Sequence, residues 1–274
     1  MSINNAECRK QESIPSSPTP YSLLPTPSLL DYLSQYPRIG VAFSGGVDSS
    51  YLLYAAKAAG CDVRAYIIKS QFQPQFEFDD AVRLADSIGV PLTVGMFDAL
   101  DDPNIVKNPS DRCYYCKNAI LSKLWELAEA DGVSVLCDGS NADDDASDRP
   151  GMRALREHGV LSPLRDCGLT KADIRRLSKQ AGLFTHDKPS YACLATRIPA
   201  NTVITGELLD KVERAESALF DMGFSDFRVR LMPPDGAKLQ VSAVQWSLAA
   251  ARREEILAAL QPYFVDVVLD FSLR

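Results

Sequence analysis

The sequence predicts an α/β protein with a parallel sheet, followed by a smaller C-terminal α+β part. From residue 39 to residue 137, short apolar strand-like runs alternate with helix-like runs, which is typical of parallel βαβ units. Beyond Arg197 the order changes to helix, two strands, helix and strand. We therefore expect an N-terminal tail over 1–37, an α/β domain over 38–197 and an α+β domain over 198–274.

The predicted elements follow this division. The tail is rich in Ser and Pro, which favours a mobile or loosely docked segment, with a short helix over Leu29–Tyr36. In the α/β part we expect strands over 39–43, 63–68, 92–97 and 133–137 and helices over 51–59, 76–88 and 118–130. Thr170 and Asp173 have the spacing of a capping box, so a helix should begin at Thr170. The C-terminal part should contain helices over 207–222 and 248–260 and strands over 227–231, 238–241 and 265–269.

Composition and charge exclude several classes of protein. The 274 residues, of which 46% are apolar, suffice for a substantial core. A formal net charge of −7 disfavours binding of long nucleic acid through a broad basic surface. The chain contains no apolar run of the roughly 20 residues that span a bilayer and no N-terminal export signal, so we expect a cytoplasmic protein that does not bind membranes.

A short loop joins the first predicted strand to the following helix. It consists of Ser44, Gly45, Gly46, Val47, Asp48, Ser49 and Ser50. A glycine pair lets the backbone approach an anion, and the N–H groups of the next helix's first turn bind negative oxygens. Ligands of open parallel sheets bind beyond the carboxyl ends of the strands, where 138–141 should also arrive from a later strand. The loop therefore predicts ATP binding, although a plain serine-glycine turn is the alternative, and it lacks the lysine of the G-x-x-x-x-G-K-[ST] motif.

The seven cysteines are an odd number in a chain without an export signal, which disfavours a disulfide framework. Cys113 and Cys116 form a C-x-x-C pair just before a predicted helix. This spacing serves zinc, an iron–sulfur cluster or dithiol redox chemistry, but no second C-x-x-C completes a four-cysteine zinc site, and a structural thiol pair stays open. Cys61 and Cys137 lie in or beside strand-like stretches and are expected to be small buried side chains.

A further cysteine, Cys193, lies in a loop-like segment at the predicted domain junction, between Lys188 and Arg197. Nearby cations favour the thiolate, which helps both nucleophilic attack and metal ligation. The alternative is an inert cysteine packed under a loop.

Several separated motifs, in the same order, resemble the LarE family of ATP-dependent sulfur transferases within the PP-loop ATP pyrophosphatase superfamily. The resemblance covers about Arg38 to Arg274. It is carried by SGGVDS at 44–49, DRCYYCK at 111–117, DGSNADD at 138–144, RPG at 149–151, SPL at 162–164 and CLATRIP at 193–199.

The resemblance implies chemistry on pyridinium-3,5-biscarboxylic acid mononucleotide, a precursor of the nickel-pincer cofactor. ATP would adenylate a substrate carboxylate with Mg²⁺ shielding the triphosphate, and a sulfur nucleophile would displace AMP to leave a thiocarboxylate. The second carboxylate would react in the same way. The residues implied for the ATP site are Ser44, Gly45, Gly46, Asp48, Ser49 and Ser50, and Asp48 would orient magnesium or pyrophosphate.

The family implies two sulfur sources. Members with one cysteine at the position of Cys193 give up its sulfur and end with dehydroalanine there. Members with three cysteines hold a [4Fe-4S] cluster whose fourth iron has no cysteine ligand and carries an extra sulfide. With Cys113, Cys116 and Cys193 as implied ligands, this chain resembles the second type, and Cys193 is also the implied catalytic residue. The sequence does not identify the sulfide donor.

The C-terminal part carries weaker signals. Arg228 and Arg230 lie on one face of a predicted strand, where the resemblance implies contact with a nucleotide or substrate phosphate; a solvated strand face is the alternative. Relatives often have an acidic residue near the position of Gln240, so a metal site in this part is in doubt. Glu213 and Glu216 are interpreted as exposed helix charges. The resemblance also implies a homo-oligomer.

Other functions share some of these features. Enzymes that thiolate tRNA also join such loops to cysteines, but the acidic charge and the lack of a clear RNA-binding module disfavour this reading. Amide-forming ATP pyrophosphatases do not need the three cysteines. A non-catalytic nucleotide-binding or zinc-stabilised module is a further alternative.

Overall fold

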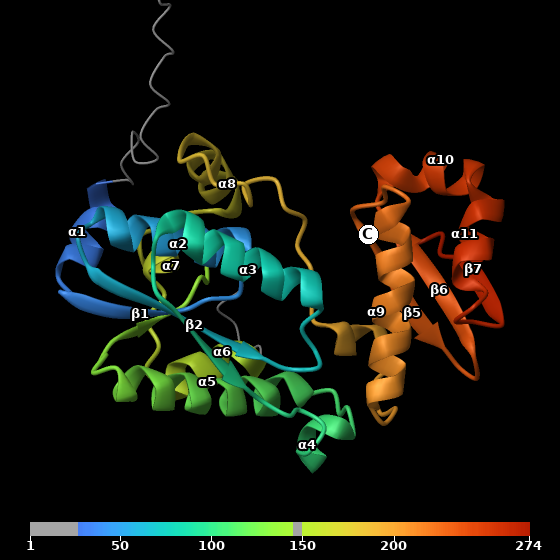
Figure 1. Cartoon of the computed structure of the whole chain (residues 1–274), viewed down its shortest axis with the longest axis horizontal. Coiled ribbons are helices and arrows are strands. Elements are labelled where there is room, and N and C mark those ends of the chain that lie inside the picture. Colours follow the sequence, from blue (N-terminus) through green and yellow to red (C-terminus); the bar gives the residue numbers. More distant parts are fainter. Residues whose placement is uncertain (1–26, 145–149) are drawn as a thin grey trace, which may run out of the picture.

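The computed structural model describes residues 27–144 and 150–274 and contains two sheets (Figure 1). The first is fully parallel, in the order β3-β2-β1-β4. Its strands are β1 (Arg38–Ala42), β2 (Asp62–Lys69), β3 (Leu92–Met96) and β4 (Leu136–Cys137). The predicted parallel α/β fold is therefore confirmed.

Helices cover both faces of this sheet, with α2 and α3 on one side and α5 and α6 on the other (Figure 1). Burial on both faces explains why three consecutive residues of β1, Ile39, Gly40 and Val41, are all buried. The helices of this part are α1 (Pro27–Ser34), α2 (Val47–Ala58), α3 (Gln75–Ile88), α4 (Pro103–Val106), α5 (Arg112–Ala130), α6 (Pro150–Glu157), α7 (Pro163–Asp166) and α8 (Lys171–Gln180). The predicted capping box is present at the start of α8, where Thr170 and Asp173 bond each other reciprocally.

The C-terminal part is a three-stranded mixed sheet with helices, which confirms the α+β prediction (Figure 1). Strand β6 pairs antiparallel with β5 and parallel with β7. The elements are the 3-10 turn η1 (Leu194–Arg197), α9 (Gly206–Asp221), β5 (Phe227–Met232), β6 (Gly236–Val241), α10 (Ala243–Ala251), α11 (Arg253–Leu260) and β7 (Asp266–Leu269).

The two parts share a core. Phe72 and Ile105 from the first part pack in one buried cluster with Leu194, Leu209 and Val212. Helix α1 also belongs to the core, since Leu29 and Leu33 are fully buried, so the docked structure begins before residue 38. The division at residues 197 and 198 is kept here as a proposal.

Three predicted elements differ in the structure. Helix α5 begins at Arg112, so Cys113 and Cys116 lie in its first turns rather than before it. The helix expected over 248–260 is split at Arg252, whose guanidinium donates to Met222 O at 2.6 Å. The last strand of the parallel sheet is only two residues long.

Among the residues that the structure describes, no helix combines the length and apolarity needed to cross a membrane. The tail over 1–26 and Arg149 of the RPG motif lie outside those residues.

Candidate active site

The phosphate loop follows the carboxyl end of β1 and leads into α2, as predicted. Its own hydroxyls hold its shape: Ser44 Oγ and Ser49 Oγ lie 3.1 Å apart, and Ser50 Oγ donates to Gly46 O at 2.7 Å. Gly45 adopts φ +73°, and a Cβ there would lie 2.8 Å from Ala81 Cβ, so only glycine fits. The first N–H groups of α2 have no intrahelical partner and are available for an anion.

Asp48 lies at the first turn of α2 and pairs with Lys171 of α8, with Nζ 2.5 Å from Oδ2. Its other oxygen, Oδ1, is buried and accepts no hydrogen bond from the described residues. Burial raises the pKa of the Asp48 carboxyl, and Lys171 opposes that shift. The unsatisfied Oδ1 fits a hard cation or a donor supplied by a ligand.

The segment after β4 reaches the same rim, as expected. Gly139 packs against the first turn of α2, where a Cβ would lie 2.7 Å from Ser49 N. Asp138 is buried and accepts from Ser140 Oγ at 2.6 Å and Ser162 Oγ at 2.7 Å. A cavity of about 210 Å³ is lined jointly by this segment and the phosphate loop.

Three lysines from outside the loop line its cavities: Lys117, Lys171 and Lys188. Lys188 is mostly buried and pairs with Asp80 at 2.8 Å and Glu77 at 3.2 Å. These cations supply the positive charge that the loop itself lacks. Sequence reasoning did not assign Lys117 or Lys171, because they lie 67 or more positions beyond the loop's last residue. Lys117 ends the DRCYYCK motif, which was interpreted only through its cysteines, and no local motif marks Lys171.

The structure brings the three predicted cysteines together. Arg112 Nη2 donates to Cys113 Sγ and to Cys193 Sγ, at 3.7 Å each. Cys116 and Cys193 line one cavity of about 300 Å³, which also reaches Ser44 of the phosphate loop. Nucleotide loop and thiols therefore share one space.

Burial disfavours the thiolate forms of Cys116 and Cys193. Burial raises the pKa of Cys116 to about 12 and lifts the pKa of Cys193 above its ordinary value of 9.0. The positive charge of Arg112 opposes both shifts. A bound metal would favour the thiolates, since it stabilises their negative charge.

Within 27–144 and 150–274, no group of three or more His, Cys, Asp or Glu side chains is arranged around one metal-ion position. Cysteine ligands of a cluster bind different irons and need not converge on one point, and the buried guanidinium of Arg112 would balance an anionic cluster. A cluster held by Cys113, Cys116 and Cys193 stays a prediction.

Arginines bind the backbone around Cys193. Arg228 Nη2 donates to Ser190 O at 2.7 Å, and Arg230 Nη1 donates to Thr196 O at 2.8 Å. Arg228 is only 5% exposed, so the alternative of a solvated strand face is wrong for it. A phosphate contact of Arg228 and Arg230 stays a prediction.

The interpretation of Glu216 as an exposed helix charge was wrong. It is 1% exposed rather than an open helix charge, and it pairs with the fully buried Arg197, with Nε 2.7 Å from Oε1. Glu213 accepts from Gln75 N at 2.7 Å and is half-buried. The residues that bury Glu216 are distant from it in the sequence, so the neighbouring residues gave no sign that it is buried.

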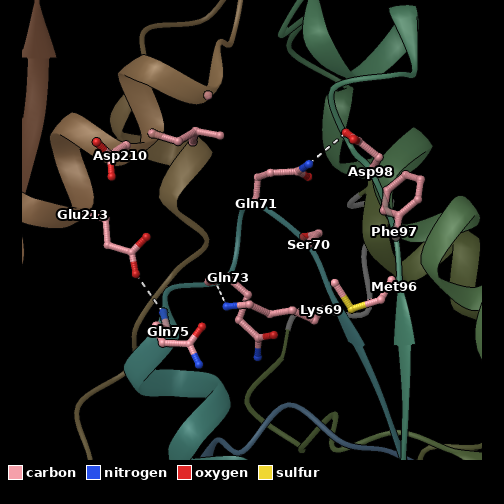
Figure 2. Close-up of a pocket in the computed structure, with 12 residues that line it drawn as sticks. Lys69, Ser70, Gln71, Gln73, Gln75, Met96, Phe97, Asp98, Asp210 and Glu213 are labelled. Carbon is pink, nitrogen blue, oxygen red and sulfur yellow. Dashed lines mark hydrogen bonds between the residues drawn. The ribbon is translucent and has the colours of Figure 1, made fainter.

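A larger cavity, of about 510 Å³, lies between α9 and the ends of β2 and β3 (Figure 2). Asp210 and Glu213 border it on the α9 side, and Gln71 binds Asp98 at 2.9 Å on the other (Figure 2). It adjoins the cysteine cavity, because Ser70 and Gln73 line both. None of the predicted site residues lines this larger cavity.

Known proteins match this arrangement. The asparagine synthase family model matches residues 31–144, which contain the phosphate loop and the C-x-x-C pair. An uncharacterized protein of Synechocystis sp. is 35% identical over 204 residues, or 74% of this chain and 76% of that protein. A tRNA-specific 2-thiouridylase of Pseudothermotoga lettingae is 28% identical over 188 residues, or 55% of this chain and 54% of that protein.

A relative whose name states an activity covers about three quarters of the chain. The pyridinium-3,5-bisthiocarboxylic acid mononucleotide synthase of Lactiplantibacillus plantarum, a LarE enzyme, is 34% identical over 205 residues, which cover 74% of each chain. Identity of this extent, together with the phosphate loop and the adjoining thiols, shows that the chain belongs to the LarE family and is an ATP-dependent sulfur transferase.

Proposed function

We propose that this enzyme inserts sulfur into pyridinium-3,5-biscarboxylic acid mononucleotide. The observation that carries the proposal is the cavity that joins the phosphate loop to Cys116 and Cys193, since activation by ATP and sulfur transfer must occur at one carboxylate. The name of the Lactiplantibacillus plantarum relative supports this substrate.

The chemistry has two steps. A carboxylate oxygen of the substrate attacks the α-phosphorus of ATP, and the bond to the β-phosphate oxygen breaks, so that pyrophosphate leaves. A sulfur nucleophile then attacks the acyl carbon, the C–O bond to AMP breaks, and a thiocarboxylate remains. Adenylation is needed because AMP is a far better leaving group than the oxide of a carboxylate.

The chain's residues divide these tasks. Asp48 Oδ1, buried without a partner in the described residues, would hold Mg²⁺, and Lys117, Lys171 and Lys188 would balance the phosphate charge. Ser44 and the first turn of α2 would bind phosphate oxygens.

Cys113, Cys116 and Cys193 would hold a [4Fe-4S] cluster, which when bound supplies sulfide at the iron without a cysteine ligand. Arg112 would lower the cost of negative charge at these sulfurs. Sacrifice of Cys193's own sulfur is the competing source, and it leaves dehydroalanine at that position.

Two measurements test the proposal. Anaerobically purified protein should contain about four irons and matching sulfide per chain, lost in Cys193→Ala. With ATP and the substrate, the enzyme should release pyrophosphate and form a thiocarboxylate detectable by mass spectrometry. The Cys193→Ala variant should still release pyrophosphate but should form no thiocarboxylate. Stoichiometric zinc would overturn the cluster, and a protein mass lowered by H₂S after one turnover would identify the sacrificial source.

Thiolation of tRNA is a second candidate, favoured by the resemblance to 2-thiouridylases over 55% of the chain. The same assay with tRNA in place of the mononucleotide distinguishes it. Thiolated tRNA without thiocarboxylate would replace the proposal.

A further inference from the structure

We infer that the buried ion pair between Arg197 and Glu216 is a positioning element for Cys193, which fixes the sulfur of that residue in the cavity shared with the phosphate loop. The inference rests on the proposed function, because it assumes that Cys193 acts in sulfur transfer.

Glu216 is the centre of this element. Arg197 and Glu216 are 0% and 1% exposed, so water does not stabilise either charge. The carboxylate accepts from Arg197 Nε at 2.7 Å, Arg197 Nη2 at 3.0 Å and Val229 N at 2.8 Å, and also from the hydroxyl of Tyr191. Four donors saturate the two oxygens, and one of them belongs to the backbone of β5.

The same residues hold both sides of Cys193. Tyr191 precedes it by two positions and Arg197 follows it by four. Arg197 Nη1 also donates to Ala192 O at 3.1 Å and to Thr196 Oγ1 at 2.8 Å. Both ends of the short segment around the thiol are thus fixed to one carboxylate on α9.

Stability alone does not explain this arrangement. The free-energy cost of removing two charges from water offsets most of their mutual attraction. Apolar residues of similar volume therefore often stabilise a core as much as a buried ion pair, or more. The directional hydrogen bonds instead fix one geometry for the segment. Sulfur transfer needs such a geometry, because a misplacement of about 1 Å at a reacting group reduces a rate by about 10²-fold.

Adenylation should not share this dependence. Neither Arg197 nor Glu216 lines the cavities of about 200 and 210 Å³ beside the phosphate loop, and Tyr191, which lines one of them, has its hydroxyl bound to Glu216. Loss of the pair should therefore separate the two steps of the reaction.

The experiment compares the full-length enzyme with Glu216→Gln and Tyr191→Phe. Tyr191→Phe removes a single donor and keeps the ring, so it tests the idea if Glu216→Gln folds poorly. Arg214→Gln on the same helix is the matched control, since its pair with Asp210 is 65% and 58% exposed and Arg214 lines none of the cavities described above. Each protein is assayed for substrate-dependent pyrophosphate release and for thiocarboxylate formed, and amide hydrogen exchange is measured for peptides covering 189–197 and 44–53.

We expect Glu216→Gln to lower the thiocarboxylate formed per pyrophosphate by about tenfold or more, with pyrophosphate release within about threefold of the wild type. Tyr191→Phe should lower the same ratio by about two- to fivefold. Exchange should accelerate in 189–197 but not in 44–53, and Arg214→Gln should change neither the product ratio nor the exchange.

An unchanged ratio in both variants, or unchanged exchange in 189–197, would overturn the inference. If the wild-type enzyme formed no thiocarboxylate, the proposed function would fail, and the exchange comparison would still decide whether the pair orders this segment.

Discussion

The phosphate loop and the cysteine segment are both loops, but they are held in different ways. The phosphate loop is shaped by bonds among its own residues, such as Ser50 Oγ to Gly46 O at 2.7 Å. The segment around Cys193 is held by side chains from the C-terminal part, including Arg228 on Ser190 O at 2.7 Å. The shape of the phosphate loop is thus determined by residues that are close together in the sequence. The position of the Cys193 thiol depends instead on how the two parts of the molecule pack.

This difference predicts which changes affect which step. Changes in the phosphate loop should alter adenylation and leave the cysteine segment ordered. Changes in the C-terminal part should alter sulfur transfer and leave ATP binding intact.

The largest effect should come from breaking the buried pair. Arg197→Met leaves Glu216 charged and without its main partner, so the free energy of unfolding should fall by about 3–5 kcal/mol. Arg214→Met, at an exposed pair on the same helix, should cost under about 1 kcal/mol. Urea denaturation measures both. A double variant with Glu216→Leu should regain most of the stability but not sulfur transfer, and equal costs for the two single variants would contradict this account.

The next effect should appear in the phosphate loop. Asp48→Asn removes the negative charge next to Lys171 and weakens the proposed Mg²⁺ ligand, because a neutral amide replaces the carboxylate, so substrate-dependent pyrophosphate release should fall by about 10²-fold. Hydrogen exchange in 189–197 should not change. Faster exchange there would show that the two loops are coupled.

A smaller effect is expected for Gly45→Ala. The left-handed backbone and a Cβ placed 2.8 Å from Ala81 Cβ should together lower the free energy of unfolding by about 1–3 kcal/mol and weaken ATP binding. Gly60→Ala is the control, because Gly60 is also left-handed (φ +84°) but has nothing within 4 Å of a new Cβ. Equal losses in both would mean that packing at Gly45 contributes nothing.

The smallest effect concerns thiol reactivity. Burial raises the pKa of Cys193 and Arg112 opposes the shift, so Arg112→Met should raise that pKa further. A higher pKa leaves less thiolate, so in metal-free protein at pH 8 alkylation of Cys193 should slow by about three- to tenfold, and the deficit should shrink as the pH rises. Peptide mass spectrometry, with Cys167 as internal reference, measures the rate. An unchanged or faster reaction would exclude the electrostatic role of Arg112.

Much of the fold was predictable because its signals are local. The alternation of apolar runs predicted the parallel sheet, and the capping-box spacing of Thr170 and Asp173 predicted the start of α8. The phosphate loop and the three thiols were predicted from short motifs. That the phosphate loop, Cys116 and Cys193 would meet at one cavity was implied only by the family resemblance.

The remaining features depend on contacts between distant residues. Glu216 has the sequence surroundings of an exposed helix charge, and only Arg197 and Val229, brought to it by the fold, explain its burial. The break at Arg252 depends on a bond to Met222 O, which no helix propensity predicts. Lys171 reaches Asp48 across 123 positions.

The ion pair of Arg197 and Glu216 crosses the proposed domain boundary, with one partner at its last residue and the other on α9. Chimeras of this family that exchange C-terminal parts at residue 197 will therefore separate two charges unless both parents carry the same pair. The two residues should be inherited together, and a natural relative that has lost one of them should also have lost the other.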